Sequence, residues 1–176
     1  MTKQDLTQFK SDNTGNPAVY VGTYGKYNGG SIYGMWFDLT TFADYDEFVE
    51  ACKVLHSDEA DPEFMFQDYE YFPKELYCES MIDEETFDKI IAYANCTDKD
   101  KADAFISLFG ADAFEDEDSV NENYFGYFDS YYDLGVQCAE SCLDIPAELE
   151  PYFDYERYGR DCAYDLNEMD GYYWWN

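Results

Sequence analysis

Carboxylate side chains are the most abundant chemically active groups in this sequence. Forty aspartate and glutamate residues face ten lysine and arginine residues, which gives a formal net charge of −30. Paired carboxylates can catalyse glycoside hydrolysis, but among forty acids some pair has a suitable separation by chance. Calcium loops are not indicated, because Asp98/Asp100 and Asp116/Asp118 have no glycine at the sixth loop position and no glutamate at the twelfth. The carboxylates alone therefore do not identify an enzyme.

Nucleophilic and nucleotide chemistry have little support in the sequence. His56 is the only histidine, and there is no G-x-S-x-G elbow and no Walker or Rossmann glycine pattern. The six cysteines include no C-x-x-C pair, so a disulfide framework is not expected. Cys138 and Cys142 would share one helix face, which leaves a metal site as the alternative to six small buried hydrophobic residues. We favour the buried residues and expect neither an enzyme nor a cofactor.

High charge coincides in this chain with many aromatic side chains. Phe, Tyr and Trp make up 20% of the residues. Charge on this scale would by itself predict a disordered chain, whereas so many aromatic side chains supply the apolar surface of a packed core. The chain is therefore expected to fold despite the repulsion among its negatively charged side chains. Charge that opposes folding in this way suggests a partner that recognises negative charge.

The acidity also limits the partners and the location. Nucleic acids and anionic membranes carry the same sign of charge, so we expect neither to bind directly. No stretch approaches the roughly 20 apolar residues of a membrane span, and residues 1–18 contain no signal-peptide core. We expect a cytoplasmic protein.

The amount of charge is comparable with that of a short DNA duplex. B-DNA carries one negative charge per roughly 1.7 Å, so a net charge of −30 matches about 50 Å, or about 15 base pairs. Acids three or four residues apart on a helix lie roughly 5 to 6 Å from one another. The net charge is −3 over residues 1–56, −12 over 57–114 and −15 over 115–176, which favours the last two thirds as the electrostatic surface. Such a surface could occupy the basic groove of a DNA-binding enzyme.

The first third predicts a small sheet with one helix. Residues 19–23 and 32–37 are rich in β-branched and aromatic side chains and predict a hairpin around the turn-rich segment 25–30. Residues 64–69 predict a third strand. A helix is predicted over residues 45–55, with Thr41 or Asp44 as its N-cap and Glu47 completing a capping box with Asp44.

The remaining sequence predicts short helices and two further strands. Helices are expected to begin at residue 83 and to span residues 99–109, while the acidic tract 115–118 predicts a solvated loop. Residues 124–128 predict a strand and 132–143 a helix. Two further helices are expected, one with Pro146 in its first turn and one capped by Asp154; the turn at residues 170–171 then precedes an aromatic strand over 172–175.

We therefore predict an α+β protein of three small units. The first is residues 1–72, of which 1–17 form a polar extension; the second is the helical segment 73–113, and the third is the α/β segment 114–176 with strands and about three helices. The many aromatic residues fit either a subunit interface or simple core packing.

Three stretches of the sequence carry a family resemblance. They are residues 19–38 (VYVGTYGKYNGGSIYGMWFD), residues 67–70 (QDYE) and, most specifically, residues 145–161 (IPAELEPYFDYERYGRD). In these stretches the chain resembles the ArdA antirestriction proteins carried by mobile genetic elements. It departs from the family pattern in residues 1–17 and in its unusually aromatic ending, 171–176.

The resemblance implies an elongated molecule that forms a curved homodimer through its C-terminal region, with acids that imitate bent B-form DNA. The implied partner is a type I restriction-modification enzyme, whose DNA-recognition groove would be blocked, so that restriction, and also modification, of incoming DNA is prevented. The carboxylates predicted to imitate phosphates are Asp83, Glu84, Asp88, Asp112, Glu115, Asp116, Glu117, Asp118, Glu122, Asp129, Asp133, Glu140, Asp144, Glu148, Glu150, Asp154, Glu156, Asp161 and Asp165.

Three other interpretations stay open at this point. A binding module for a different basic protein, such as a nucleoid or histone-like protein or another defence system, would carry similar charge. A halophilic protein would also be acidic and poor in lysine, but it should gain stability at molar salt, where a DNA mimic loses affinity. A carboxylate-based hydrolase would turn over its substrate, whereas a mimic binds one for one.

Overall fold

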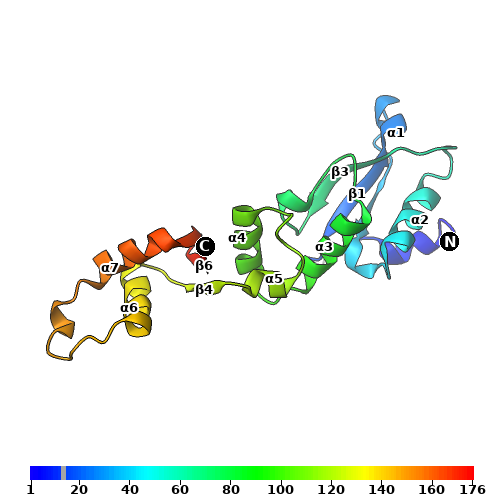
Figure 1. The fold of residues 1–176 in the computed structure, drawn as a ribbon. Helices are drawn as coiled ribbons and strands as arrows, with labels where there is room; N and C mark the ends of the chain where they lie inside the picture. Colours follow the sequence, from blue (N-terminus) through cyan, green and yellow to red (C-terminus); the bar gives the residue numbers. More distant parts are fainter. Residues whose placement is uncertain (13–14) are drawn as a thin grey trace. The chain divides into compact units, whose positions relative to one another are not determined.

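The chain folds into two compact units. The computed structural model describes residues 1–12 and 15–176. The N-terminal unit contains residues 1–97 with 115–117, and the C-terminal unit contains residues 98–114 with 118–176. Each unit has a three-stranded antiparallel sheet and helices, so the predicted α+β class is confirmed. Figure 1 shows these elements along the chain. The division into three units at residues 72 and 113 stays a prediction.

The sheet of the N-terminal unit follows the predicted strands. Strands β1 (Ala18–Thr23), β2 (Met35–Asp38) and β3 (Phe64–Glu70) lie in the order β2-β1-β3, and both pairs are antiparallel. The predicted hairpin is confirmed in its pairing. Its connection, predicted as a turn, contains the short helix α1 (Tyr24–Asn28).

Two helices accompany this sheet, and both begin where the sequence predicts. Helix α2 (Tyr45–Leu55) has Asp44 as its N-cap, whose carboxylate accepts a hydrogen bond from the Glu47 backbone N–H at 2.8 Å. The Glu47 carboxylate accepts from the Ala43 N–H, one residue before the cap, so the capping box is displaced by one position. Helix α3 (Glu84–Asn95) begins after its own acidic N-cap.

The core of the N-terminal unit is built from aromatic rings. Phe48 of α2 packs against Phe37, Phe66 and Phe87, with ring centroids 6.5, 6.1 and 5.6 Å away. Residues 1–17, predicted as a polar extension, also contribute, because Phe9 is 3% exposed and its ring stacks on another phenylalanine of the core. The apolar residues of this segment therefore anchor it to the unit.

The sheet of the C-terminal unit includes a hairpin whose second strand is aromatic. Strands β4 (Tyr124–Tyr127), β5 (Leu166–Met169) and β6 (Tyr172–Trp175) lie in the order β4-β6-β5. The predicted turn and β6 are confirmed, and positive φ angles of 52° at Asp170 and 84° at Gly171 suit a tight two-residue hairpin turn. The sequence did not predict β5, whose short polar run has no β-branched residue.

Four helices of the C-terminal part were predicted with mixed success. Helices α4 (Lys99–Phe109), α6 (Tyr131–Cys142) and α7 (Tyr155–Cys162) are confirmed. The acidic tract 115–118 was predicted as a loop, but helix α5 (Glu117–Asn121) begins within it. The helix predicted at Pro146 is wrong, because residues 147–149 form only a turn. Short 3₁₀ helices occur at Asp5–Phe9, Leu39–Thr41, Lys74–Leu76, Glu150–Tyr152 and Ala163–Asp165.

No helix within residues 1–12 and 15–176 has the length and apolarity of a transmembrane span.

Helices α6 and α7 pack at backbone contact through two glycines. A Cβ atom added to Gly135 would lie 1.9 Å from the carbonyl oxygen of Tyr155, and one added to Gly159 would lie 1.9 Å from that of Tyr131. No side chain can be accommodated at either distance, because the opposing atoms belong to backbone that cannot rotate away. The hydrogen atoms of the two glycines therefore set how closely these helices approach.

We expect Gly135→Ala to destabilise the C-terminal unit. In an isolated helix the change would be favourable by about 1 kcal/mol, because alanine is the better helix former. Here the added methyl group forces α6 and α7 apart, and overpacking of this kind costs about 2 kcal/mol or more. Urea unfolding should give a lower free energy of unfolding for Gly135→Ala, while the exposed α6 variant Gln137→Ala should behave like the wild type. A Gly135→Ala variant as stable as the wild type would contradict the close packing.

Candidate functional site

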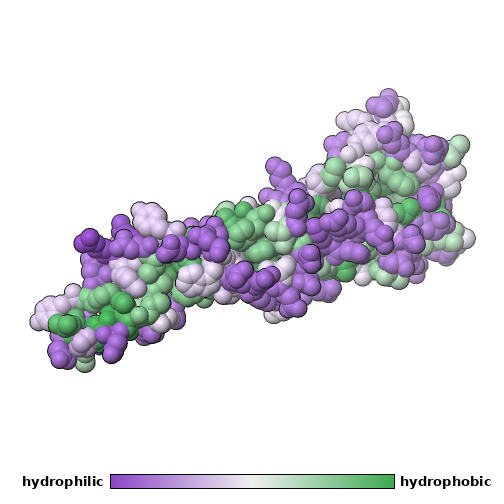
Figure 2. All heavy atoms as spheres, in the orientation of Figure 1, coloured by the Kyte–Doolittle hydropathy of each residue, from purple (hydrophilic) through white to green (hydrophobic). Residues whose placement is uncertain are grey.

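The carboxylates predicted to imitate phosphates lie almost entirely on the surface. Seventeen of the nineteen are exposed, and the other two, Asp83 and Glu117, are half-buried. Figure 2 shows hydrophilic residues over much of the visible face of both units. The predicted surface is therefore accessible to a partner.

Helix α3 carries three of these carboxylates at its first two turns. Asp83 is the N-cap, and its Oδ1 accepts from the Thr86 backbone N–H at 2.9 Å. Hydrogen bonds from the Thr86 hydroxyl and backbone N–H lower the pKa of the Asp83 carboxyl below its ordinary value of 3.8. Glu84 and Asp88 are exposed, four residues apart on the same helix face. Asp83 is thus a structural residue as well as a source of charge.

Glu117 in the acidic tract around α5 is held in place by hydrogen bonds. Glu117 accepts hydrogen bonds from both the backbone N–H and the hydroxyl of Thr97, each at 3.2 Å. The other members of this group are exposed, and they are Asp112, Glu115, Asp116, Asp118 and Glu122.

Several carboxylates near α6 and α7 are oriented by neighbouring donors. Asp129 accepts from the Tyr127 hydroxyl at 2.8 Å, and Asp133 accepts from the side chain of the α6 N-cap, Ser130. Asp154 caps α7 and accepts from the backbone N–H three residues later, at 3.0 Å. Hydrogen bonds of this kind fix the direction of a carboxylate without neutralising its charge.

The remaining carboxylates of the predicted set in the C-terminal unit differ in their partners. Glu156 forms an i,i+4 ion pair with Arg160, whose guanidinium also lies 5.5 Å from the Tyr131 ring centroid. The others are exposed, and within the described residues their carboxylates accept no hydrogen bond and form no ion pair: Glu140, Asp144, Glu148, Glu150, Asp161 and Asp165. Ten basic residues cannot neutralise forty acids, so the surface keeps most of its charge.

The charge is divided almost equally between the units. The N-terminal unit has 22 acidic and six basic residues, a net charge of −16, and the C-terminal unit has 18 and four, a net charge of −14. The increase in negative charge along the sequence therefore does not produce a large difference in net charge between the two folded units. A net charge of −14 corresponds to about 24 Å of B-DNA.

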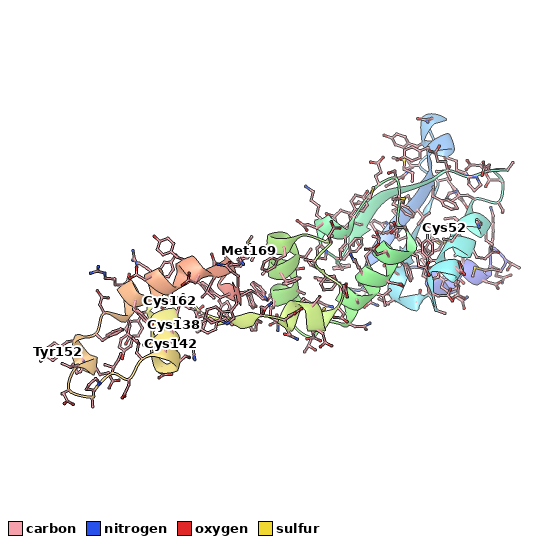
Figure 3. All side chains as sticks on the ribbon, viewed as in Figure 1. Cys52, Cys138, Cys142, Tyr152, Cys162 and Met169 are labelled. Carbon is pink, nitrogen blue, oxygen red and sulfur yellow. The ribbon has the colours of Figure 1, made fainter. Side chains whose placement is uncertain are left out.

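The cysteines do not behave as one class. Cys52, Cys96 and Cys138 are buried as predicted, but Cys78 and Cys142 are exposed and Cys162 is half-buried, so the prediction of six buried residues was wrong. Figure 3 places Cys138 and Cys142 on α6 close to Cys162 on α7. Burial, followed by the hydrogen bond with Cys162, raises the pKa of the Cys138 thiol to about 12. In the described part of the chain no three Cys, His, Asp or Glu side chains converge as metal ligands.

A comparison with protein families identifies one match. The family model of the antirestriction protein ArdA matches residues 19–173.

The chain belongs to the ArdA family.

ArdA proteins are antirestriction proteins, which are inhibitors rather than enzymes. The match covers both folded units of this ArdA protein and leaves residues 1–18 and 174–176 outside it. No curated protein matches the chain.

Sequence reasoning missed the two glycines that position the acids of this ArdA protein. Asp133 and Glu140 lie on α6, and Glu156 and Asp161 lie on α7, so the contact between the two helices sets the spacing of all four. The available signal was an isolated glycine inside each helical pattern, which indicates a close packing contact.

We expect Asp83→Ala to destabilise the N-terminal unit and Asp88→Ala to leave it unchanged. Loss of an acidic N-cap costs about 1 kcal/mol, whereas Asp88 is an exposed acid on the same helix. Folding lowers the pKa of Asp83, so its ionised carboxylate contributes fully to the free energy of unfolding at neutral pH. This contribution is lost as the pH falls below 3.8 and through the lower pKa of the folded state. Urea unfolding at pH 7 and pH 3 measures the free energy of unfolding of each variant. Equal losses of this free energy in Asp83→Ala and Asp88→Ala would contradict the capping role.

Proposed function

We propose that this ArdA protein acts as a mimic of B-form DNA that occupies the DNA-binding groove of type I restriction-modification enzymes. In the host cytoplasm it would block restriction, and also modification, of incoming mobile-element DNA. The observation that carries the proposal is the exposure of seventeen of the nineteen predicted carboxylates on a chain that belongs to an antirestriction family. Nucleic acid itself is then a competitor and not a partner.

Orientation of the carboxylates supports imitation of a structured polymer. A phosphate backbone presents its charges at fixed positions, and flexible acids would lose entropy when the partner fixes them. In this chain hydrogen bonds from helix termini, a loop or strand β4 are accepted by Asp83, Glu117, Asp129, Asp133 and Asp154. Part of the charge is therefore already positioned before the partner binds.

The density of charge indicates that no single helix forms the binding surface. Helix α6 has 12 residues and therefore spans about 18 Å, over which B-DNA would carry about ten phosphates. It supplies only two acids, Asp133 and Glu140. Imitation of a duplex therefore requires many elements to contribute together, which is why we assign the binding energy to the whole surface.

We further propose that the protein acts as a homodimer. Large apolar side chains are exposed in the C-terminal unit, among them Leu149 at 56%, Tyr152 at 85% and Tyr164 at 83%. Figure 3 shows Tyr152 directed away from the helices in the connection between α6 and α7. Exposed apolar residues in this number are typical of a protein interface. Two copies would also double the length of duplex that is imitated.

A different basic protein is the alternative partner. Negative charge attracts nucleoid proteins and other DNA-targeting defence systems by the same forces, so charge alone does not select among them. Membership of an antirestriction family favours a restriction enzyme as the partner.

We expect the protein to compete with duplex DNA for a type I restriction enzyme. A binding assay with purified enzyme should show displacement by saturating duplex. It should also show a steep loss of affinity as salt rises from 50 to 200 mM, because salt screens the attraction between exposed charges that are farther apart than about 10 Å. Inhibition that is unaffected by saturating DNA would exclude groove occupancy. Stability and activity that increase at molar salt would instead favour a halophilic protein.

The position of the acids should matter beyond their number. We expect the triple variant Glu140→Gln, Asp144→Asn, Asp161→Asn to weaken inhibition about tenfold, while Asp161→Asn alone costs little because each exposed charge is screened. The matched control is Asp12→Asn, Asp46→Asn, Glu50→Gln, which removes three exposed acids of the N-terminal unit outside the predicted set. The measurement is the concentration that gives half-maximal inhibition of DNA cleavage.

Two outcomes would contradict this expectation. Equal effects of the two triple variants would mean that only net charge matters. A complete loss of inhibition in Asp161→Asn, with an unchanged free energy of unfolding, would mean that a discrete site replaces the distributed surface.

A further inference from the structure

The C-terminal unit contains an aromatic cavity that the distribution of charge does not explain. Its volume is about 260 Å³, and its walls include Phe105, Phe109, Trp174 and Trp175, with Glu122 and Asn123 beside them. Small-molecule sites usually measure about 300 to 1,000 Å³, so a cavity of this size suits one inserted side chain. Figure 2 shows apolar surface over α4, the helix that supplies the two phenylalanines.

The walls of this cavity are held in place. The Trp174 indole N–H donates to the Val120 carbonyl oxygen at 2.8 Å, and the Trp175 backbone N–H donates to the Asn123 carbonyl oxygen at 2.9 Å. The Trp174 ring lies 5.8 and 5.9 Å from the rings of Phe105 and Phe109. Trp174 is 1% exposed and its indole N–H is already used, so the aromatic surface that an occupant can reach belongs mainly to Phe109 and Trp175. Fixed walls lower the entropy that is lost on binding.

The cavity is open to solvent and is negatively charged at its edge. Phe109 is 36% and Trp175 47% exposed. Glu122 is exposed, and within the described residues its carboxylate has no hydrogen-bond or ion-pair partner. Aromatic faces attract cations, most strongly those of tryptophan, and the carboxylate adds an acceptor for a donor group. The surrounding unit has a net charge of −14, which excludes an anionic occupant and favours a cation.

The chain already contains one example of this interaction beside the cavity. The ammonium of Lys101 lies 4.7 Å from the centroid of the Tyr124 ring, which is 5.5 Å from that of Trp174. Between the two basic side chains, arginine suits the cavity better. Its planar guanidinium stacks on aromatic rings, is less strongly hydrated than an ammonium, and can donate two hydrogen bonds to one carboxylate.

We propose that this cavity binds one arginine side chain of the basic partner protein. The inference rests on the proposed function for the nature of that partner, since a groove that binds DNA phosphates is rich in arginine. Aromatic residues around a fully desolvated arginine are typical of the few interface contacts that dominate affinity. The cavity thus adds a contact of defined shape to an otherwise distributed surface of charge.

Binding of a single arginine can be tested without any partner. The probe is N-acetyl-arginine methylamide, its neutral control is the corresponding citrulline compound, and the reporter is the NMR signal of the Trp174 indole N–H. We expect a saturable shift with the arginine probe and a shift at least fivefold smaller with citrulline or in Glu122→Gln, because the charge interaction is removed. The variant Glu50→Gln, at an exposed acid outside the predicted set, should respond like the wild type. Equal shifts with both probes, or no shift, would overturn the proposal.

Inhibition measurements on variants of the cavity distinguish a failure of the arginine site from a failure of the proposed function. We expect Glu122→Gln and Phe109→Ala to raise the concentration for half-maximal inhibition about tenfold, and Glu50→Gln, at an exposed acid outside the predicted set, less than twofold. Glu122→Gln leaves the aromatic walls intact, so it tests the site even where Phe109→Ala unfolds. A wild-type protein that does not inhibit contradicts the proposed function.

Two further outcomes contradict only the arginine site. One is an inhibitory wild type whose Glu122→Gln variant is equally potent. The other is occupation by a second copy of the chain, which would shift the Trp174 signal with protein concentration and prevent the arginine probe from binding.

Discussion

Aromatic burial must offset the repulsion among an excess of thirty negative charges, and the rest of the structure depends on that balance. Two exposed charges 5 to 6 Å apart repel by about 0.7 kcal/mol in water, and salt screens them beyond about 8 Å. A fully buried aromatic side chain contributes about 1.5 to 3 kcal/mol. One ring such as Phe48 or Trp174 therefore compensates for two to four neighbouring repulsions. The balance holds only while the acids stay in water, which explains why the chain combines aromatic cores with an exposed acidic surface.

Part of that acidic surface also stabilises the helices. Asp44, Asp83, Asp98 and Asp154 each cap a helix by accepting a backbone N–H, and the positive end of the helix dipole favours their charge. At these positions a negative charge stabilises the fold instead of opposing it. The cap also fixes the carboxylate in space. Helix capping thus reconciles the need for a stable fold with the need for charges at defined positions.

Local patterns predicted most of the elements, and tertiary contacts account for the rest. Helices α2, α3 and α7 followed from acidic residues at the helix start and from apolar spacing, which are local signals. Strand β5 was missed because its pairing partner, β6, determines it more than its own residues do. The exposure of the candidate acids followed from their residue types. Two other features depend on partners that are distant in sequence: the packing of Phe9 against the core of the N-terminal unit, and the contact between Gly135 and Gly159.

Distributed charge and a single shaped cavity would act on different stages of association. Long-range attraction between an acidic surface and a basic groove accelerates encounter, but it leaves the register undefined, because sliding the surface by one charge changes the energy little. An arginine held between Phe109 and Trp175 allows only one register. Contact with aromatic rings is also screened by salt much less than exposed charge pairs are. Imitation of DNA by charge therefore explains how a partner is attracted, and a contact of defined shape is the kind of feature that would let this acidic protein retain one basic protein and release another.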